Sequence, residues 1–166
     1  MRLVRWVCEK SHTVIQIGHI TRYHKISQVL THFARKENNI KIDSVEDMKR
    51  HKIGTIRDDM AEQHLVNVGI SLDDMDRVAE TMLNIKKLNR GRIDLWAYGE
   101  NVAMWEFKAN GFDPADYESV HELGSKSLYF AFHKDALDAV IAKLQAALDS
   151  NKADGEYDKI LDRYVR

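Results

Sequence analysis

Residues 52–59 read KIGTIRDD, and this stretch decides the expected fold class. The apolar run that ends at Ile56 predicts a short strand, and the three charged residues behind it predict a turn. A helix is expected next, ending near Gly69, because glycine favours the position behind a helix. The expected apolar positions of this helix are Met60, Leu65 and Val66.

The same strand–turn–helix unit recurs downstream. Residues 77–79 and 93–98 predict strands, and each is followed by a helical pattern that ends at a glycine, Gly91 or Gly111. Strands that alternate with helices are typical of an α/β fold. We therefore expect a mostly parallel sheet that helices cover on both faces.

The segments upstream extend this scheme. Residues 28–35 predict a strand, and residues 43–48 predict a short helix that Asp43 or Ser44 caps by accepting free backbone N–H groups. Residues 1–27 show no clear period and stay unassigned.

The end of the chain has a different character. Residues 128–133 predict a strand, residues 136–148 a helix, and the last ten residues a final helix. One apolar face is expected on each helix, made of Val140, Ile141, Leu144 and Leu148 on the first and of Tyr157, Ile160, Leu161 and Tyr164 on the second.

Composition excludes several classes of function. The 166 residues hold 25 basic and 26 acidic side chains, a net charge of −1, which gives no electrostatic basis for binding nucleic acid. The single cysteine, Cys8, excludes an intramolecular disulfide. Charged residues interrupt the N-terminal apolar stretch too early for an export signal. If the sequence is complete, we expect a cytoplasmic protein.

The candidate site follows from the ends of the predicted strands, since ligands of open α/β sheets bind beyond the carboxyl ends of the strands. The predicted ligand-binding residues are Arg57, Asp58, Asp59, Met60, Tyr98 and Glu100. Simple capping is the alternative role for Asp58 and Asp59, and stabilisation of a helix dipole is the alternative for Glu100. For Trp96, core packing is the simpler interpretation.

No motif for catalysis or metal binding is present. His19 and His24 are five residues apart, which does not place them on one helix face, and His121 and His133 fall on different predicted strands. The sequence lacks HExxH, GxSxG and GxxxxGK patterns. We therefore expect no metal, no cofactor and no enzymatic activity.

Three landmarks resemble one protein family. Residues 42–48 with 52–55, residues 88–94, and residues 142–148 with 153–160 are similar, in this order, to segments of the extracellular solute-binding proteins of family three. These are the periplasmic binding proteins for polar amino acids. Each landmark is weak alone, but together they span most of residues 40–165.

The resemblance implies a type 2 periplasmic-binding fold with two lobes. Residues 40–122 would form the second lobe, residues 123–166 would return to the first, and residues 1–39 would hold a remnant of a truncated first lobe. It also implies a periplasmic location, no catalysis, and an ABC transporter membrane component as partner.

The candidate site departs from the family pattern. Asp58, Asp59 and Met60 stand where the family places small and hydroxyl residues that hold a ligand carboxylate, and Gly99 stands in place of an ammonium-binding aspartate, with Glu100 next to it. Carboxylates repel another carboxylate. The expected ligand is therefore a small polar solute, amino-acid-like or amine-bearing, whose positive end faces Asp59 and Glu100.

Three other functions remain open. A truncated chain could form a homo-oligomer, such as a homodimer, by lobe exchange and bind no ligand. An effector-sensing domain of a transcription regulator shares this type of fold, but no helix-turn-helix or basic segment is present. An enzyme of the same architecture would use Glu100.

Overall fold

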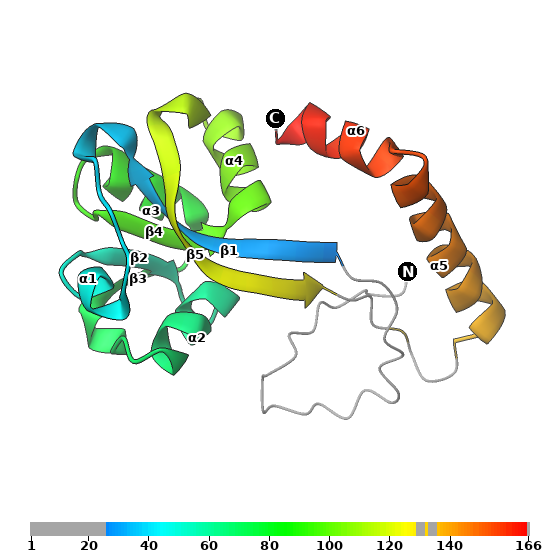
Figure 1. Cartoon of the computed structure of the whole chain (residues 1–166), viewed down its shortest axis with the longest axis horizontal. Coiled ribbons are helices and arrows are strands. Elements are labelled where there is room, and N and C mark those ends of the chain that lie inside the picture. Colours follow the sequence, from blue (N-terminus) through cyan, green and yellow to red (C-terminus); the bar gives the residue numbers. More distant parts are fainter. Residues whose placement is uncertain (1–25, 129–131, 133–135, 166) are drawn as a thin grey trace. The chain divides into compact units, whose positions relative to one another are not determined.

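The computed structural model describes residues 26–128, 132 and 136–165 (Figure 1). The chain divides into two compact units, Gln28–Ser125 and a second unit that includes Lys126–Tyr164. The predicted lobe boundaries stay a prediction.

A five-stranded mixed sheet forms the centre of the first unit. Its order is β3-β2-β4-β1-β5, with β2 parallel to both β3 and β4, and β1 antiparallel to β4. The strands are β1 (Ile26–Arg35), β2 (Ile53–Ile56), β3 (Met75–Val78), β4 (Leu95–Gly99) and β5 (Tyr117–Leu128). The α/β class with helices on both faces is confirmed, and the parallel arrangement holds for β3, β2 and β4.

Helices cover both faces of this sheet (Figure 1). On one face α1 (Val45–Met48) and α2 (Met60–Asn67) bury Met48 and Leu65 in one apolar cluster. On the other, α3 (Thr81–Asn89) and α4 (Glu100–Ala109) contribute Ile85 and Phe107 to a second, aromatic cluster around Trp96. Short 3-10 helices lie at Lys36–Asn38, Leu72–Asp74 and Pro114–Asp116. Because successive strand residues face opposite sides, β1, β4 and β5 contribute side chains to both clusters, whereas β2 and β3 contribute to the first.

The sequence left the bounds of one strand open. His121 falls on a predicted strand, and in the structure it lies on β5, whose residues are mostly polar and hide the pattern. Val66, one of the apolar positions expected to mark α2, is 42% exposed, because Ala61, Glu62 and Leu65 form the inner face of the helix. The strand predicted at 128–133 lies largely outside the described residues.

The second unit contains two helices, α5 (Asp138–Ala153) and α6 (Glu156–Tyr164), as predicted. The apolar face predicted on α5 is buried at Ile141, whereas Val140 is 55% exposed. Ile160 and Tyr164 of α6 are exposed as well. Among the described residues, no helix is both long and apolar enough to cross a membrane.

Candidate functional site

The turn between β2 and α2 contains the first half of the predicted site. Asp58 takes a left-handed conformation with φ of 59°, which is uncommon for a residue with a side chain. Asp59 is the N-cap of α2, and its Oδ2 accepts a hydrogen bond from the Ala61 N–H at 3.5 Å. The capping role that the sequence offered for Asp59 is therefore confirmed.

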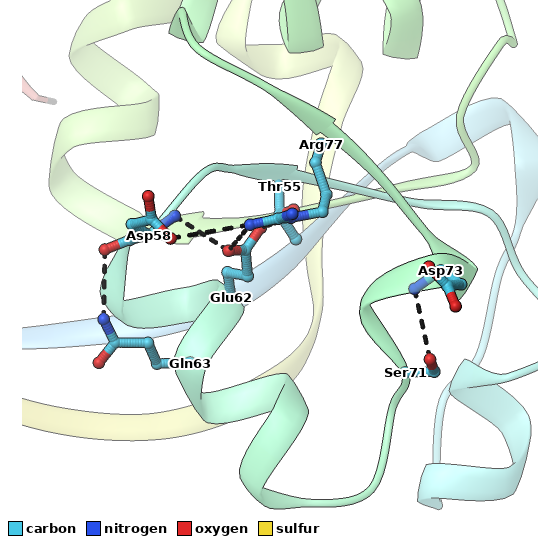
Figure 2. Close-up of polar contacts among 7 residues, drawn as sticks. All are labelled: Thr55, Asp58, Glu62, Gln63, Ser71, Asp73 and Arg77. Carbon is cyan, nitrogen blue, oxygen red and sulfur yellow. Dashed lines mark hydrogen bonds and ion pairs between the residues drawn. The ribbon is translucent and has the colours of Figure 1, made fainter.

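A buried carboxylate lies directly behind this turn (Figure 2). Glu62 of α2 is 3% exposed and accepts hydrogen bonds from Arg77 Nε at 2.7 Å and Arg77 Nη2 at 2.8 Å. The Thr55 hydroxyl of β2 donates to Glu62 Oε2 at 3.0 Å, and the Asp58 N–H donates to Glu62 Oε1 at 2.9 Å. The two-pronged Arg77 contact is the strong geometry for a guanidinium–carboxylate pair.

The surroundings shift the pKa values of Glu62 and Asp59, at the start of α2, in opposite directions. The hydrogen bonds from Arg77 are the largest influence that lowers the pKa of Glu62, with further lowering by Asp58 and Thr55 against the effect of burial. Burial raises the pKa of Asp59, although the backbone N–H groups of Met60 and Ala61 counteract it. Glu62 is thus held as an anion more firmly than its neighbour.

The junction between β4 and α4 contains the second half of the predicted site. Gly99 is the N-cap of α4, without a side-chain cap, and Glu100 is the first residue of the helix. A Cβ built on Gly99 would lie 1.7 Å from Gln28 Nε2. The side-chain amide of Gln28, from β1, therefore occupies the space that a side chain at position 99 would take.

An electrostatic interaction between Asp59 and Tyr98 links the two halves of the predicted site. Tyr98 stacks on Trp96, with ring centroids 4.9 Å apart. Burial raises the pKa of Tyr98 to about 12, and the negative charge of Asp59 adds to the rise. The charge of Asp59 can act on the Tyr98 phenol because β2 and β4 are parallel neighbours.

The other two predicted site residues have mixed roles. Met60 packs against the apolar cluster of α1 and α2, which is a core contact. Arg57 is exposed on the turn, and its backbone N–H donates to the Val78 carbonyl at 2.9 Å. Trp96 is fully buried, as the sequence predicted for a core residue.

The sequence matches no profile of a known protein family and no curated protein. Solved structures do match. An ancestral arginine-binding protein bound to arginine matches with a TM-score of 0.64 at 25% identity, over 93% of this chain and 68% of that chain. AbpA, an amino acid ABC transporter substrate-binding protein from Streptococcus pneumoniae bound to L-arginine, matches with a TM-score of 0.68 at 18% identity, over 94% and 64%.

A histidine kinase sensor domain with similarity to periplasmic binding proteins matches with a TM-score of 0.64 at 17% identity, over 87% of this chain and 61% of that chain. The chain is structurally similar to amino-acid-binding periplasmic binding proteins. It spans 61% to 68% of the length of the three proteins described. The type 2 periplasmic-binding fold that the sequence landmarks implied is confirmed over this part.

Sequence reasoning missed four residues near the two halves of the site in this periplasmic-binding fold: Thr55, Glu62, Arg77 and Gln28. One signal was available, because Asp59 and Glu62 have the spacing of a capping box. In the structure, however, Glu62 accepts from the N–H of Asp58 and not from that of Asp59. The contacts with Arg77, fifteen residues away, leave no local pattern.

A buried histidine lies elsewhere in the sheet. His32 of β1 is fully buried, and neither ring nitrogen has a hydrogen-bond partner among the residues that the structure describes. Burial lowers its pKa to about 3, with smaller contributions from His121, His64 and His51. Within the described ranges no group of three or more histidine, cysteine or acidic side chains is placed to hold a metal ion.

Proposed function

We propose that this chain binds a small, positively charged polar solute at the ends of β2 and β4 and does no chemistry on it. The observation that carries the proposal is the Asp59 cap: the N-terminus of α2 already holds a carboxylate of the protein itself. Helix N-termini attract anions. At the N-terminus of α2, Asp59 of the protein itself takes the place of a bound anion, so this end of the helix carries a negative charge.

The remaining charges support a cationic ligand. Asp58, Asp59 and Glu100 contribute carboxylates at the two strand ends, whereas the charge of Arg77 is neutralised by Glu62. Arg57 is the one cation on the turn itself. A ligand amine or guanidinium is attracted by this arrangement, and a ligand carboxylate is repelled.

The matched proteins suggest the setting. AbpA serves an amino acid ABC transporter, and another matched protein is a histidine kinase sensor domain. Our proposal is that this chain likewise contributes to uptake or sensing, with an ABC transporter membrane component as a partner and a periplasmic location. Fractionation of cells that produce the full-length protein, with antibody detection, tests the location.

Thermal unfolding with a panel of solutes tests the binding. Agmatine, putrescine, L-arginine, L-glutamine and succinate, each at millimolar concentration, separate the contributions of amine and carboxylate. We expect agmatine and putrescine to raise the unfolding midpoint and succinate to leave it unchanged, because only a ligand that prefers the folded state stabilises it. No shift with any solute would reject the proposal.

Two substitutions localise the effect. Asp59→Asn and Glu100→Gln each remove a negative charge, and each is expected to reduce the shift caused by agmatine. Glu46→Gln is the matched control, because Glu46 lies on α1 and pairs only with Lys49 in the contacts described.

A homo-oligomer without ligand is the second candidate. The observation in its favour is the exposure of apolar side chains at the N-cap of α5, Leu137, and on α5 and α6, namely Val140, Leu144, Ile160 and Tyr164. Such side chains gain stability when a second copy covers them. Light scattering distinguishes the candidates: a dimer indifferent to agmatine supports exchange, and a monomer at all concentrations rejects it.

A further inference from the structure

The carboxylate of Glu62 has four hydrogen-bond donors from three different segments. Oε1 accepts from the Asp58 N–H at 2.9 Å and from Arg77 Nη2 at 2.8 Å, and Oε2 accepts from Arg77 Nε at 2.7 Å and Thr55 Oγ1 at 3.0 Å. A carboxylate offers about four acceptor sites, so this one is fully used. Figure 2 shows the side chain between β2, β3 and the turn.

We propose that Glu62 is the positioning residue of the β2–α2 turn and that it determines which charge this turn presents to a ligand. Two of its partners, the Asp58 N–H and the Arg77 guanidinium, are groups that bind anions when they are free. Glu62 holds both. The positioning role stands on the geometry alone, and the role in specificity rests on the function proposed above.

The conformation of Asp58 shows why the turn needs a fixed partner. A residue other than glycine in the left-handed region carries strain that its surroundings must offset. Besides the bond from its N–H to Glu62, Asp58 has its carboxylate 3.7 Å from Arg77 Nη2 and its carbonyl oxygen bonded by Gln63 Nε2 at 3.2 Å. Arg77 is itself placed by Glu62, so two of the three contacts depend on this one carboxylate.

Replacing the carboxylate of Glu62 by an amide removes the contacts on which the proposal depends. Glu62→Gln keeps the length and shape of the side chain, but it has one acceptor oxygen and no charge. It cannot hold the guanidinium fork and the Asp58 N–H together. Arg77, whose side chain is 29% exposed, then becomes available to a ligand carboxylate at the edge of the turn.

Amide hydrogen exchange of the whole chain, read by NMR, tests the positioning role without any ligand. We expect the Asp58 amide to exchange at least about tenfold faster in Glu62→Gln, because the loss of a charged acceptor is worth about this factor. The control variant Glu46→Gln should leave it unchanged. Equal exchange in Glu62→Gln and Glu46→Gln overturns the positioning role.

A second variant keeps the test decisive if Glu62→Gln does not fold. Arg77→Lys retains the positive charge but loses the two-pronged contact. We expect the Asp58 amide to exchange faster than in Glu46→Gln but by less than about tenfold, because Asp58 still bonds to Glu62. No rise above the Glu46→Gln control contradicts the proposal.

Titration calorimetry with agmatine and L-arginine tests the role in specificity, since the two solutes differ by one carboxylate. Wild type should prefer agmatine, and Glu62→Gln should shift the affinity ratio about tenfold toward L-arginine. An unchanged ratio overturns the role in specificity. Failure of wild type to bind either solute overturns the role in specificity. The proposed function falls with it only if the thermal panel also shows no shift, and the exchange result still decides the positioning role.

Discussion

The two strand ends that make up the candidate site are built in opposite ways. At the β2–α2 turn, side chains cap, pair and hydrogen-bond one another: Asp59 caps the helix, and Glu62 binds Arg77, Thr55 and the backbone of Asp58. At the β4–α4 junction, the N-cap is Gly99, and the neighbouring space is filled by the neutral amide of Gln28.

This difference separates two ways of shaping a site. The β2–α2 turn depends on charge, because the buried carboxylate of Glu62 organises it. Replacing Glu62 should therefore lower the free energy of unfolding and also change the charge that the turn presents. The junction depends on space, because a glycine permits the approach of another side chain. Replacing the buried carboxylate Glu62 should therefore cost more stability than any substitution at the junction.

The largest expected effect is the loss of Glu62. Glu62→Leu leaves the Thr55 hydroxyl and the Asp58 N–H without their acceptor, and we expect the free energy of unfolding to fall by about 3 kcal/mol. Urea unfolding measures it. Glu80→Leu, at the exposed and uncapped start of α3, is the control and should change stability by less than about 0.5 kcal/mol. A loss below about 1 kcal/mol for Glu62→Leu would contradict the contrast between the two ends.

The free energy of unfolding should depend on pH through groups whose pKa differs between the folded and the unfolded chain. His32 binds its proton only near pH 3 in the folded chain but at 6.5 when unfolded. Its lowered pKa therefore costs stability as the pH falls below 6.5, by about 2–3 kcal/mol at pH 4.5. The lowered pKa of Glu62 adds a loss that begins below its ordinary value of 4.5.

The variant His32→Leu isolates the contribution of the turn. It should remove the decline between pH 6.5 and 4.5 and retain the one below pH 4.5. The decline below pH 4.5 should be smaller in His32→Leu combined with Glu62→Gln, where the lowered pKa of Asp47 still contributes. Urea unfolding as a function of pH measures both declines. The same steep decline from pH 6.5 in His32→Leu would show that another group causes it.

Much of the first unit could be predicted from the sequence, because strand, turn and helix each leave a local pattern. Apolar runs located β2 and β4, and apolar positions ahead of Gly69 located α2. β5 lacks such a run, since apolar and polar residues mix along it. The contact between Glu62 and Arg77 depends on the pairing of β2 with β3, which no local pattern contains.

For the candidate site, the sequence indicated a possible helix cap but not which acidic side chain is buried. Capping was the alternative role for Asp58 and Asp59, because acidic residues stand before a helical pattern, and Asp59 takes this role. Which acidic residue of the first helical turn faces inward depends on packing. The sequence therefore could not distinguish the exposed Asp58 from the buried Glu62.

A smaller effect is expected at the junction. Gly99→Ala places a Cβ against the Gln28 amide, and the flexible end of that side chain must move away. We expect a loss of about 1 kcal/mol in urea unfolding. Gln28→Ala should relieve most of it, and additive losses in the double variant would show that the two residues do not touch.

The smallest effects concern the two helix starts. Asp59→Ala removes a cap whose hydrogen bond is long, 3.5 Å, so about 0.5 kcal/mol is expected. Glu100→Gln removes a charge from the first turn of α4, and about 0.3 kcal/mol is expected. Thermal unfolding in low salt resolves these differences, and a larger effect for Glu100 than for Asp59 would reverse the comparison.

An NMR titration of the isotope-labelled chain with agmatine tests the central claim most directly. If a cationic solute binds at the ends of β2 and β4, the backbone amide signals of residues 57–60 and 98–101 shift together and saturate with one affinity. Shifts confined to other residues, or no saturable shift at millimolar agmatine, would contradict the claim.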